Sequence, residues 1–267
     1  FQDAFGRLVA NVENVLVGKT FVIRLGFVAL LSEGHLLLED YPGTGKTSFA
    51  RAIAQSVQGS VSRIQFTPDL LPGDITGVSV FDQSRGEFSF HGGPVFSNIV
   101  LADEINRASP KTQAALLEAM QEFEVTYSGK TYALDRPFFI LATQNPIEQS
   151  GTFPLPEAQQ DRFLLYIRIG YPTEAEETTI LKATTSSKKT KVESVLSGEE
   201  IIRLQQLVRE VPISDELISK VSKIIRATRP ETTSDEYVKQ WVSWGAGPRA
   251  GQAMILTAKA RALSQGR

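Results

Sequence analysis

Apolar positions at the start of the chain repeat with the period of a helix. Apolar residues recur at spacings of three and four from Phe5 to Leu16 and stop at Gly18, which predicts an amphipathic helix with one buried stripe. Residues 21–31 form a denser apolar run, which predicts a second and more deeply buried helix.

Beyond this point, short apolar runs alternate with segments of helical spacing. Helices are predicted over residues 46–57 and through Leu116, Leu117 and Met120. The apolar runs predict strands at residues 36–38, 63–66, 99–102, 138–142 and 163–169. Continuous apolar strands separated by helices are typical of a parallel sheet that is covered on both faces, so the predicted fold is α/β.

Two segments interrupt this alternation with the pattern of β-hairpins. We expect them as insertions into the α/β core, near residues 78–90 and 124–133. In the first, two arms flank a polar turn that contains a glycine. In the second, the arms flank Ser128-Gly129, which suits a two-residue turn.

The pattern changes after Pro172, where the remaining chain predicts helices alone. They are expected over residues 174–183, 197–210, 214–227, 236–244 and 249–263. We therefore place a domain boundary near residue 171, with an α/β core over residues 1–170 and a smaller helical domain over 171–267. The chain stops after an amphipathic run, which leaves open a helical domain that continues in a longer natural protein.

Composition narrows the classes of protein. Apolar residues make up 42% and charged residues 22% of the 267 positions, the balance of an ordinary globular protein. The absence of cysteine excludes disulfides, thiolate nucleophiles and cysteine-based zinc sites, and two histidines argue against a histidine-rich metal site. No apolar run reaches membrane-spanning length and the first residues do not form a signal peptide, so we expect a cytoplasmic protein. The net charge of −2 gives no general attraction to nucleic acid, which argues against a nucleic-acid partner.

The first candidate for chemistry is a phosphate-binding loop directly behind the apolar run 36–38. It reads Asp40-Tyr-Pro-Gly-Thr-Gly-Lys-Thr47 and leads into a predicted helix. Backbone N–H groups of such a loop surround phosphates at a helix start, where the helix dipole favours anions. Lys46 is expected to reach the β- and γ-phosphates, and the Thr47 hydroxyl to bind Mg²⁺. The predicted cofactor-binding residues of the loop are Pro42, Gly43, Thr44, Gly45, Lys46, Thr47 and Ser48.

Asp40 stands where the usual loop pattern has glycine. Aspartate tolerates left-handed backbone angles, so the turn itself can form. Its carboxylate near phosphates is nevertheless expected to weaken nucleotide binding.

Polar residues end two further predicted strands. Asp103 and Glu104 follow the run 99–102, and carboxyl ends of parallel strands are where ligand crevices form. There, Asp103 is predicted to hold Mg²⁺ through water, and Glu104 to orient and deprotonate an attacking water. Asn145 ends the next run and suits a side chain that helps to position this water. Taken singly, the acids could also be ordinary solvated residues, and Asn145-Pro146 an ordinary turn.

Two arginines complete the set of candidates. Arg162 follows Asp161, and a cation here is suited to stabilise charge on a transferring phosphoryl group, an effect of about 10³–10⁵ in rate when a neighbour supplies it. Arg249 lies at the start of a predicted helix in the second domain, where it could reach the γ-phosphate and report domain closure. The alternatives are a surface ion pair for the first and a solvated helix start for the second.

In this order, these residues resemble the AAA+ ATPases, and specifically the MoxR family. The resemblance runs from about residue 11 to the chain end. Its most specific stretches are residues 66–77, 92–94, 103–122, 145–146 and 155–163.

The resemblance implies a role for each candidate residue. Lys46 and Thr47 correspond to Walker A, and Asp103 and Glu104 to Walker B. The remaining correspondences are Asn145 as sensor 1, Arg162 as the arginine finger given to the neighbouring subunit, Arg249 as sensor 2, and Val17 and Gly18 as the segment near adenine. The hairpins resemble the family's helix-2 and pre-sensor-1 insertions.

The family further implies a five-stranded sheet, a helical lid and a ring that is commonly a hexamer. It implies ATP and Mg²⁺ as cofactors and ATP hydrolysis as the reaction. It also implies a chaperone-like action on a client protein, often together with a von Willebrand A domain partner.

Three other functions stay open from the sequence. Asp40 favours a nucleotide-dependent binding scaffold that hydrolyses slowly or not at all. A guanine-nucleotide switch would need an Asn-Lys-x-Asp segment, which the chain lacks. A DNA-acting motor is disfavoured by the neutral charge and by the lack of a basic–aromatic stripe.

Overall fold

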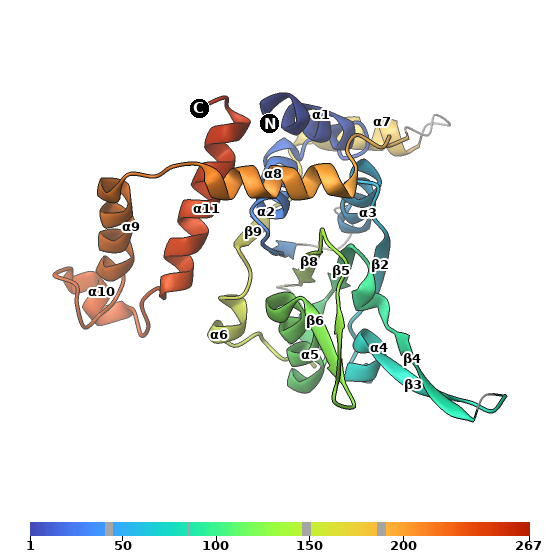
Figure 1. Cartoon of the computed structure of the whole chain (residues 1–267). Helices are drawn as coiled ribbons and strands as arrows, with labels where there is room; N and C mark the ends of the chain where they lie inside the picture. The colour runs from blue at the N-terminus through green and yellow to red at the C-terminus, as the bar shows by residue number, and fades with distance from the viewer. Residues whose placement is uncertain (41–44, 85, 146–150, 186–190) are drawn as a thin grey trace.

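The centre of the protein is a five-stranded parallel sheet. A computed structural model describes residues 1–40, 45–84, 86–145, 151–185 and 191–267. The sheet has the strand order β2-β5-β8-β1-β9, and all four neighbouring pairs are parallel (Figure 1). Its strands are β1 (Leu36–Asp40), β2 (Val61–Gln65), β5 (Ile99–Asp103), β8 (Phe139–Gln144) and β9 (Leu165–Ile169). The predicted α/β fold is confirmed.

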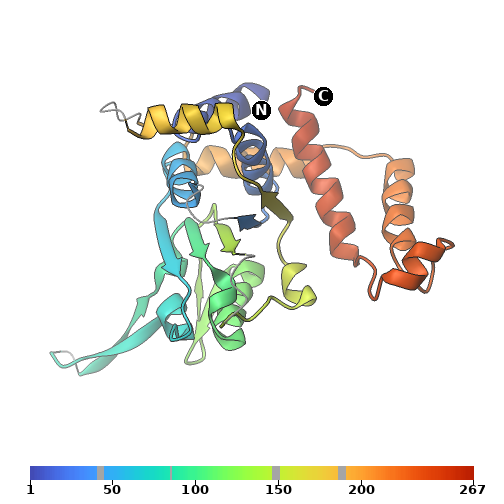
Figure 2. The same cartoon turned by 180° about the vertical axis from the view of Figure 1, so that it is seen from behind.

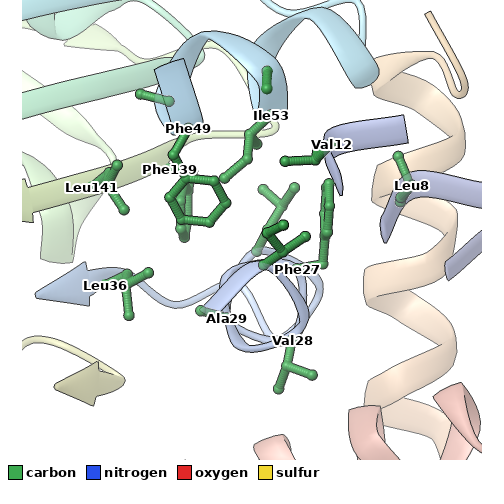
Figure 3. Packing of buried hydrophobic residues seen from close by; sticks show 14 of the residues in the cluster. Leu8, Val12, Phe27, Val28, Ala29, Leu36, Phe49, Ile53, Phe139 and Leu141 are labelled. Carbon is green, nitrogen blue, oxygen red and sulfur yellow. The ribbon is translucent and has the colours of Figure 1, made fainter. Parts of the chain in front are cut away.

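Both faces of the sheet are covered by apolar side chains, as the continuous apolar runs require. Successive residues of a strand point to opposite faces, so Leu36 and Leu38 join one core cluster and Leu37 joins the other. The first cluster is closed by α1 (Gln2–Glu13), α2 (Thr20–Leu31) and α3 (Lys46–Ser56), and the second by α4 (Pro72–Thr76) and α5 (Pro110–Glu122). Figure 3 shows Phe139 of the sheet, Phe49 of α3 and Phe27 of α2 within the first cluster.

Two hairpins extend from the sheet on the side of α4 and α5 (Figure 1). They are formed by β3 (Gly77–Asp82) with β4 (Glu87–Gly92), and by β6 (Glu124–Tyr127) with β7 (Lys130–Ala133). An aromatic contact connects the two hairpins, because the ring of Phe90 in β4 stacks on that of Tyr132 in β7 with centroids 4.1 Å apart. Short helices η1 (Pro94–Phe96) and η2 (Ile105–Arg107) flank β5.

The chain after β9 forms helices alone among the residues that the structure describes. They are α7 (Glu174–Thr184), α8 (Gly198–Glu210), α9 (Asp215–Ala227), α10 (Glu236–Trp241) and α11 (Pro248–Ser264); the short α6 (Glu157–Gln160) precedes β9. Thr173 and Ser197 cap the first two through reciprocal hydrogen bonds with the glutamates three residues later.

The helical part is not a separate body throughout. Ile201 and Val208 of α8 are buried in the first core cluster, and the Gln205 side chain donates to the Leu30 carbonyl oxygen at 2.8 Å. By contrast, α9 and α10 project away from the sheet (Figures 1 and 2). The domain boundary near residue 171 stays a prediction.

Candidate functional site

The carboxyl edge of the sheet brings the predicted phosphate, metal and water-positioning residues together. Lys46 begins α3 behind β1, Asp103 ends β5, and Asn145 directly follows β8. The strand β8 lies between the other two, with Gln144 opposite Glu39 and Ala142 opposite Ala102. Because parallel strands end at the same edge, these three residues converge on one side of the sheet.

The end of the phosphate loop has the backbone that this edge requires. Gly45 caps α3 with φ of +95°, and a Cβ there would lie 2.9 Å from Cδ1 of Leu16. Both the angle and the close approach favour glycine. Lys46 and Thr47 in the first turn of α3 are half-buried, and Ser48 is exposed. Three other predicted loop residues lie outside the described residues: Pro42, Gly43 and Thr44.

Asp103 is buried and both of its carboxylate oxygens accept hydrogen bonds. The Thr143 hydroxyl donates to Oδ1 at 2.6 Å, and a guanidinium nitrogen of Arg63 donates to Oδ2 at 2.7 Å. Charge-assisted contacts of this kind are stronger than neutral ones and fix the orientation of the carboxylate. The strand end therefore presents one positioned, negatively charged oxygen-donor group.

Glu104 occupies a rarely used backbone conformation beside it. Its φ of 58° and ψ of 48° are left-handed, a region that costs a non-glycine residue of order 1 kcal/mol and is found at functional sites. The Glu104 backbone N–H donates to the Thr143 hydroxyl oxygen at 2.9 Å. Its Oε2 accepts from Gln65 at 2.8 Å and from Arg107 at 3.0 Å. The Glu104 carboxylate is thus held between β2 and η2, and its backbone is held by β8.

The segment Val17-Gly18 lies next to this edge. Lys19 and Leu16, which flank it, line a small hollow together with Lys46 and Ile169. Gly18 has φ of +74°, and a Cβ there would meet the Glu176 side chain of α7 at 2.8 Å. The predicted adenine segment therefore lies between the phosphate loop and the first helix after β9.

The two predicted arginines lie at the other edge of the sheet. Arg162 and Arg249 line a cleft of about 600 Å³ together with His35 and Phe163. His35 precedes β1 and Phe163 precedes β9, so this cleft is at the amino ends of the strands. A strand of five residues spans about 13 Å. The structure therefore separates both arginines from Lys46 of the same chain by the depth of the sheet.

An ion pair connects the cleft walls. Arg249 at the start of α11 lies with its guanidinium 3.7 Å from Oδ2 of Asp161, which neighbours Arg162. The Nε of Arg162 is buried and has no hydrogen-bond partner in the part of the chain that the structure describes. Two guanidinium groups from different elements thus converge on one opening.

Comparisons with known proteins identify the family. A family model described as "ATPase family associated with various cellular activities (AAA)" matches residues 35–165. The uncharacterized protein YeaC of Bacillus subtilis is 47% identical over 97% of this chain and 78% of its own length. Chaperone MoxR1 of Mycobacterium tuberculosis is 44% identical over 98% of this chain and 69% of its own length. The chain belongs to the MoxR family of AAA+ ATPases.

A solved structure supports the same fold for this MoxR-family chain. The crystal structure of a protein described as an ATPase, from Cytophaga hutchinsonii, matches with a TM-score of 0.92 and 38% identity. The match covers 100% of this chain and 81% of that one. Within the described ranges, no helix of the MoxR-family chain has the length and apolar character needed to cross a membrane.

The sequence analysis did not identify the residues that hold the carboxylates of Asp103 and Glu104 in place. Thr143 contacts both Asp103 and Glu104, whereas Arg63 and Gln65 reach them from β2. The signal for Thr143 was its position within an apolar strand, two residues before Asn145. Arg63 and Gln65 depend on the pairing of β2 with β5, where Gln65 lies opposite Asp103.

Proposed function

We propose that the protein hydrolyses ATP to ADP and phosphate in a homo-oligomeric ring, and that changes between subunits remodel or mature a partner protein. One observation carries this proposal. The residues for phosphate, metal and water lie at one edge of the sheet, and the two arginines lie at the opposite edge. A ring in which successive copies meet head to tail would unite the two edges in every interface.

The carboxyl edge suits ATP with Mg²⁺. Lys46 and the N–H groups at the start of α3 would bind the phosphates. The Thr47 hydroxyl would supply an oxygen ligand of the kind that Mg²⁺ prefers, and the Asp103 carboxylate would hold the ion through water. The ion would shield the charge of the phosphates. The Arg63 guanidinium lies 2.7 Å from Oδ2 of Asp103 and keeps this carboxylate in one orientation.

Glu104 is the proposed general base for the attacking water, and Asn145 the amide that positions this water. Gln65 and Arg107 both donate to one oxygen of the Glu104 carboxylate, so its other oxygen is the one assigned to the water. The 5% exposure of Asn145 suits a side chain with one fixed orientation rather than a solvated turn.

Arg162 and Arg249 are proposed to act on the ATP of the next subunit. Both stabilise negative charge on the transferring phosphoryl group, for which a trans arginine contributes about 10³–10⁵ in rate. Their common cleft favours a shared phosphate over separate roles. Arg249 was expected to reach the γ-phosphate and report domain closure, and its pairing with Asp161 beside Arg162 supports a role at the phosphate of the neighbour.

Other parts of the proposal rest on the family. The relative MoxR1 is named a chaperone, which favours a protein client. A hexameric ring, a von Willebrand A domain partner and a cytoplasmic location are proposed on the family resemblance and the composition. A slowly hydrolysing scaffold is the second candidate, favoured by Asp40 in the loop.

A mixing experiment tests the proposal. Glu104→Gln should bind ATP without turning it over, Lys46→Ala should lose binding, and Arg162→Ala should bind but not hydrolyse. Mixed in equal amounts, Glu104→Gln and Arg162→Ala subunits would form complete sites in about one quarter of interfaces, because each site needs one residue from each copy. Phosphate release should therefore recover to about a quarter of the wild-type rate per site.

Two controls sharpen this result. A mixture of Lys46→Ala with Glu104→Gln should stay inactive, because both lesions lie on the same edge. The wild-type rate per subunit should rise with protein concentration as rings assemble. Failure of the first mixture to recover would contradict the shared site, and wild-type protein without turnover would favour the scaffold.

A further inference from the structure

Three large aromatic side chains are exposed together on the projecting part of the helical domain. Tyr237, Trp241 and Trp244 are 71%, 67% and 74% exposed, and we name them the lid patch. Tyr237 and Trp241 are four residues apart in α10 and share one helix face. Large aromatic groups gathered in this way are more typical of a protein interface than of a free surface.

The lid patch is held in a defined place beside Arg249. The segment between Trp244 and α11 is fixed to the residues that directly follow α9, because Arg229 donates to the Ala246 carbonyl oxygen at 3.0 Å. In return, the Ala246 N–H donates to the Thr228 hydroxyl at 2.8 Å. Trp244 precedes Arg249 by five residues on this braced connection. Trp244 therefore lies on a short, braced connection to Arg249, which lines the arginine cleft.

A second exposed aromatic pair lies on the opposite side. Phe21 is 69% exposed and begins α2 next to Lys19, which lines the hollow beside Lys46. Tyr171 is 71% exposed and follows Gly170, whose carbonyl oxygen accepts from the Lys19 ammonium at 3.2 Å. This pair belongs to the nucleotide side. In both views, α7 on that side and α10 lie at opposite ends of the molecule (Figures 1 and 2).

We propose that the lid patch binds a second copy of this chain, on the side of that copy that carries Phe21, Tyr171 and the nucleotide. The proposal deepens the ring of the proposed function and rests on it. Aromatic side chains bury about 150–250 Å² each, so three that are some seven-tenths exposed would supply roughly 400 Å². A stable interface buries about 800 Å² per partner, so the lid patch would form about half of one side.

The position of the patch gives it a specific task. With the tryptophans seated on the nucleotide side of the next copy, α11 would bring Arg249 toward the phosphates of that copy. Aromatic anchors next to a catalytic cation would make assembly and the completion of the active site a single event. The patch meets a different surface, so the contact propagates head to tail rather than closing a symmetric dimer.

Intrinsic tryptophan fluorescence tests the proposal without any change to the lid patch. Trp241 and Trp244 are the only tryptophans in the sequence, so the whole tryptophan signal comes from the patch. The Glu104→Gln protein with Mg-ATP is brought to assembly, which sedimentation follows independently. The tryptophan emission should shift to shorter wavelength on assembly, and the acrylamide quenching constant should fall at least about threefold, since interface cores exclude solvent. Assembled protein whose emission and quenching match those of the monomer would overturn the proposal.

Substitutions give a second, independent readout. Trp241→Ala and Trp244→Ala should each raise the protein concentration at half-assembly by about 30-fold or more, the effect of losing an aromatic hot spot. Trp244→Phe should restore most of this loss. Phe88→Ala is the matched control, because Phe88 is 73% exposed on the hairpin formed by β3 and β4 and should leave assembly unchanged. An equal effect of Phe88→Ala would contradict a specific role of the patch.

A cysteine pair distinguishes the orientation, since the chain has no cysteine of its own. Cysteines at the exposed neighbours Thr20 and Ser243 leave the aromatic side chains in place. The double variant Thr20→Cys with Ser243→Cys should give a ladder of multimers with a bismaleimide cross-linker, and neither single variant should do so. Dimers formed by Ser243→Cys alone would show patch meeting patch and overturn the head-to-tail contact. If the protein assembles and binds ATP but its tryptophans stay exposed to the quencher, only this inference is wrong. If the protein neither assembles nor binds ATP, the proposed function is wrong as well.

Discussion

His35 allows a test, through the pH dependence of stability, of the core at the amino end of the sheet. It is 3% exposed at the start of β1, with the rings of Phe123, Phe138 and Phe139 around it. The Ile140 backbone N–H donates to Nδ1 at 3.1 Å, so this nitrogen accepts and carries no proton. Nε2 therefore carries the proton and donates to the Met120 carbonyl oxygen at 3.1 Å. The imidazole is neutral and both its nitrogens are satisfied.

Burial sets the size of the effect. Desolvation lowers the pKa of His35 from 6.5 to about 4, opposed in part by the hydrogen bond to Met120. Between these values the unfolded chain binds a proton that the folded chain does not, so stability is lost as pH falls below 6.5. From pH 7 to pH 5 the loss is about 2 kcal/mol, and it approaches about 3 kcal/mol below pH 4.

The assay is urea unfolding at pH 7 and pH 5, with His35→Asn as the control. Asparagine keeps an acceptor oxygen for the Ile140 N–H and does not titrate. The variant is expected to be less stable at pH 7 but to lose about 2 kcal/mol less than wild type on acidification. All other titrating groups are common to both proteins and cancel in this difference. Equal losses in the two proteins would refute the assignment of a buried, neutral His35.

Three further substitutions test the nucleotide side. Thr143→Val removes the hydroxyl shared by a buried carboxylate and a backbone N–H, and should cost about 1–3 kcal/mol in urea unfolding and most of the turnover, whereas Thr143→Ser should keep both. Gly18→Ala should destabilise by about 1 kcal/mol or more, because φ is +74° and the Glu176 side chain lies 2.8 Å from the new Cβ; Gly170→Ala, with open space around it, is the control for this thermal melt. Asp40→Gly should tighten ATP binding about five- to tenfold, or roughly 1 kcal/mol, in a titration with a fluorescent ATP analogue. If Asp40→Gly left the ATP affinity unchanged, Asp40 would no longer favour a slowly hydrolysing scaffold.

Much of the fold could be predicted because its central strands are buried on both faces. The apolar runs at 36–38 and 99–102 became β1 and β5, since no surface residue interrupts such strands. The order of the strands could not be predicted, because it depends on pairings between residues far apart in the sequence, such as β2 with β5. The helix expected over residues 236–244 ends at Trp241, and the next residues leave the helix to pack against the end of α9.

The candidate site could be predicted where polar or charged residues directly follow apolar strands. Lys46, Asp103 and Asn145 lie at one edge because parallel strands share it. Thr143 was not predictable, because its role depends on the register that sets β8 beside β5. The residue pattern alone did not give the distance of Arg162 from Lys46 within one chain, because this distance depends on the parallel pairing of β9 with β1. Only the family resemblance, with its arginine finger for the neighbouring subunit, indicated it.

The long last helix has a mechanical consequence. At its carboxyl end, Ala260 and Ser264 of α11 are buried against the body of the molecule, and at its amino end the same helix bears Arg249. Its 17 residues make a rod of about 25 Å. In the proposed assembly, the tilt of α11 would set the angle between successive copies. A small rotation at its buried carboxyl end would move its amino end, and Arg249 with it, by a larger distance. The curvature and size of the oligomer would therefore depend on how α11 packs in its own chain.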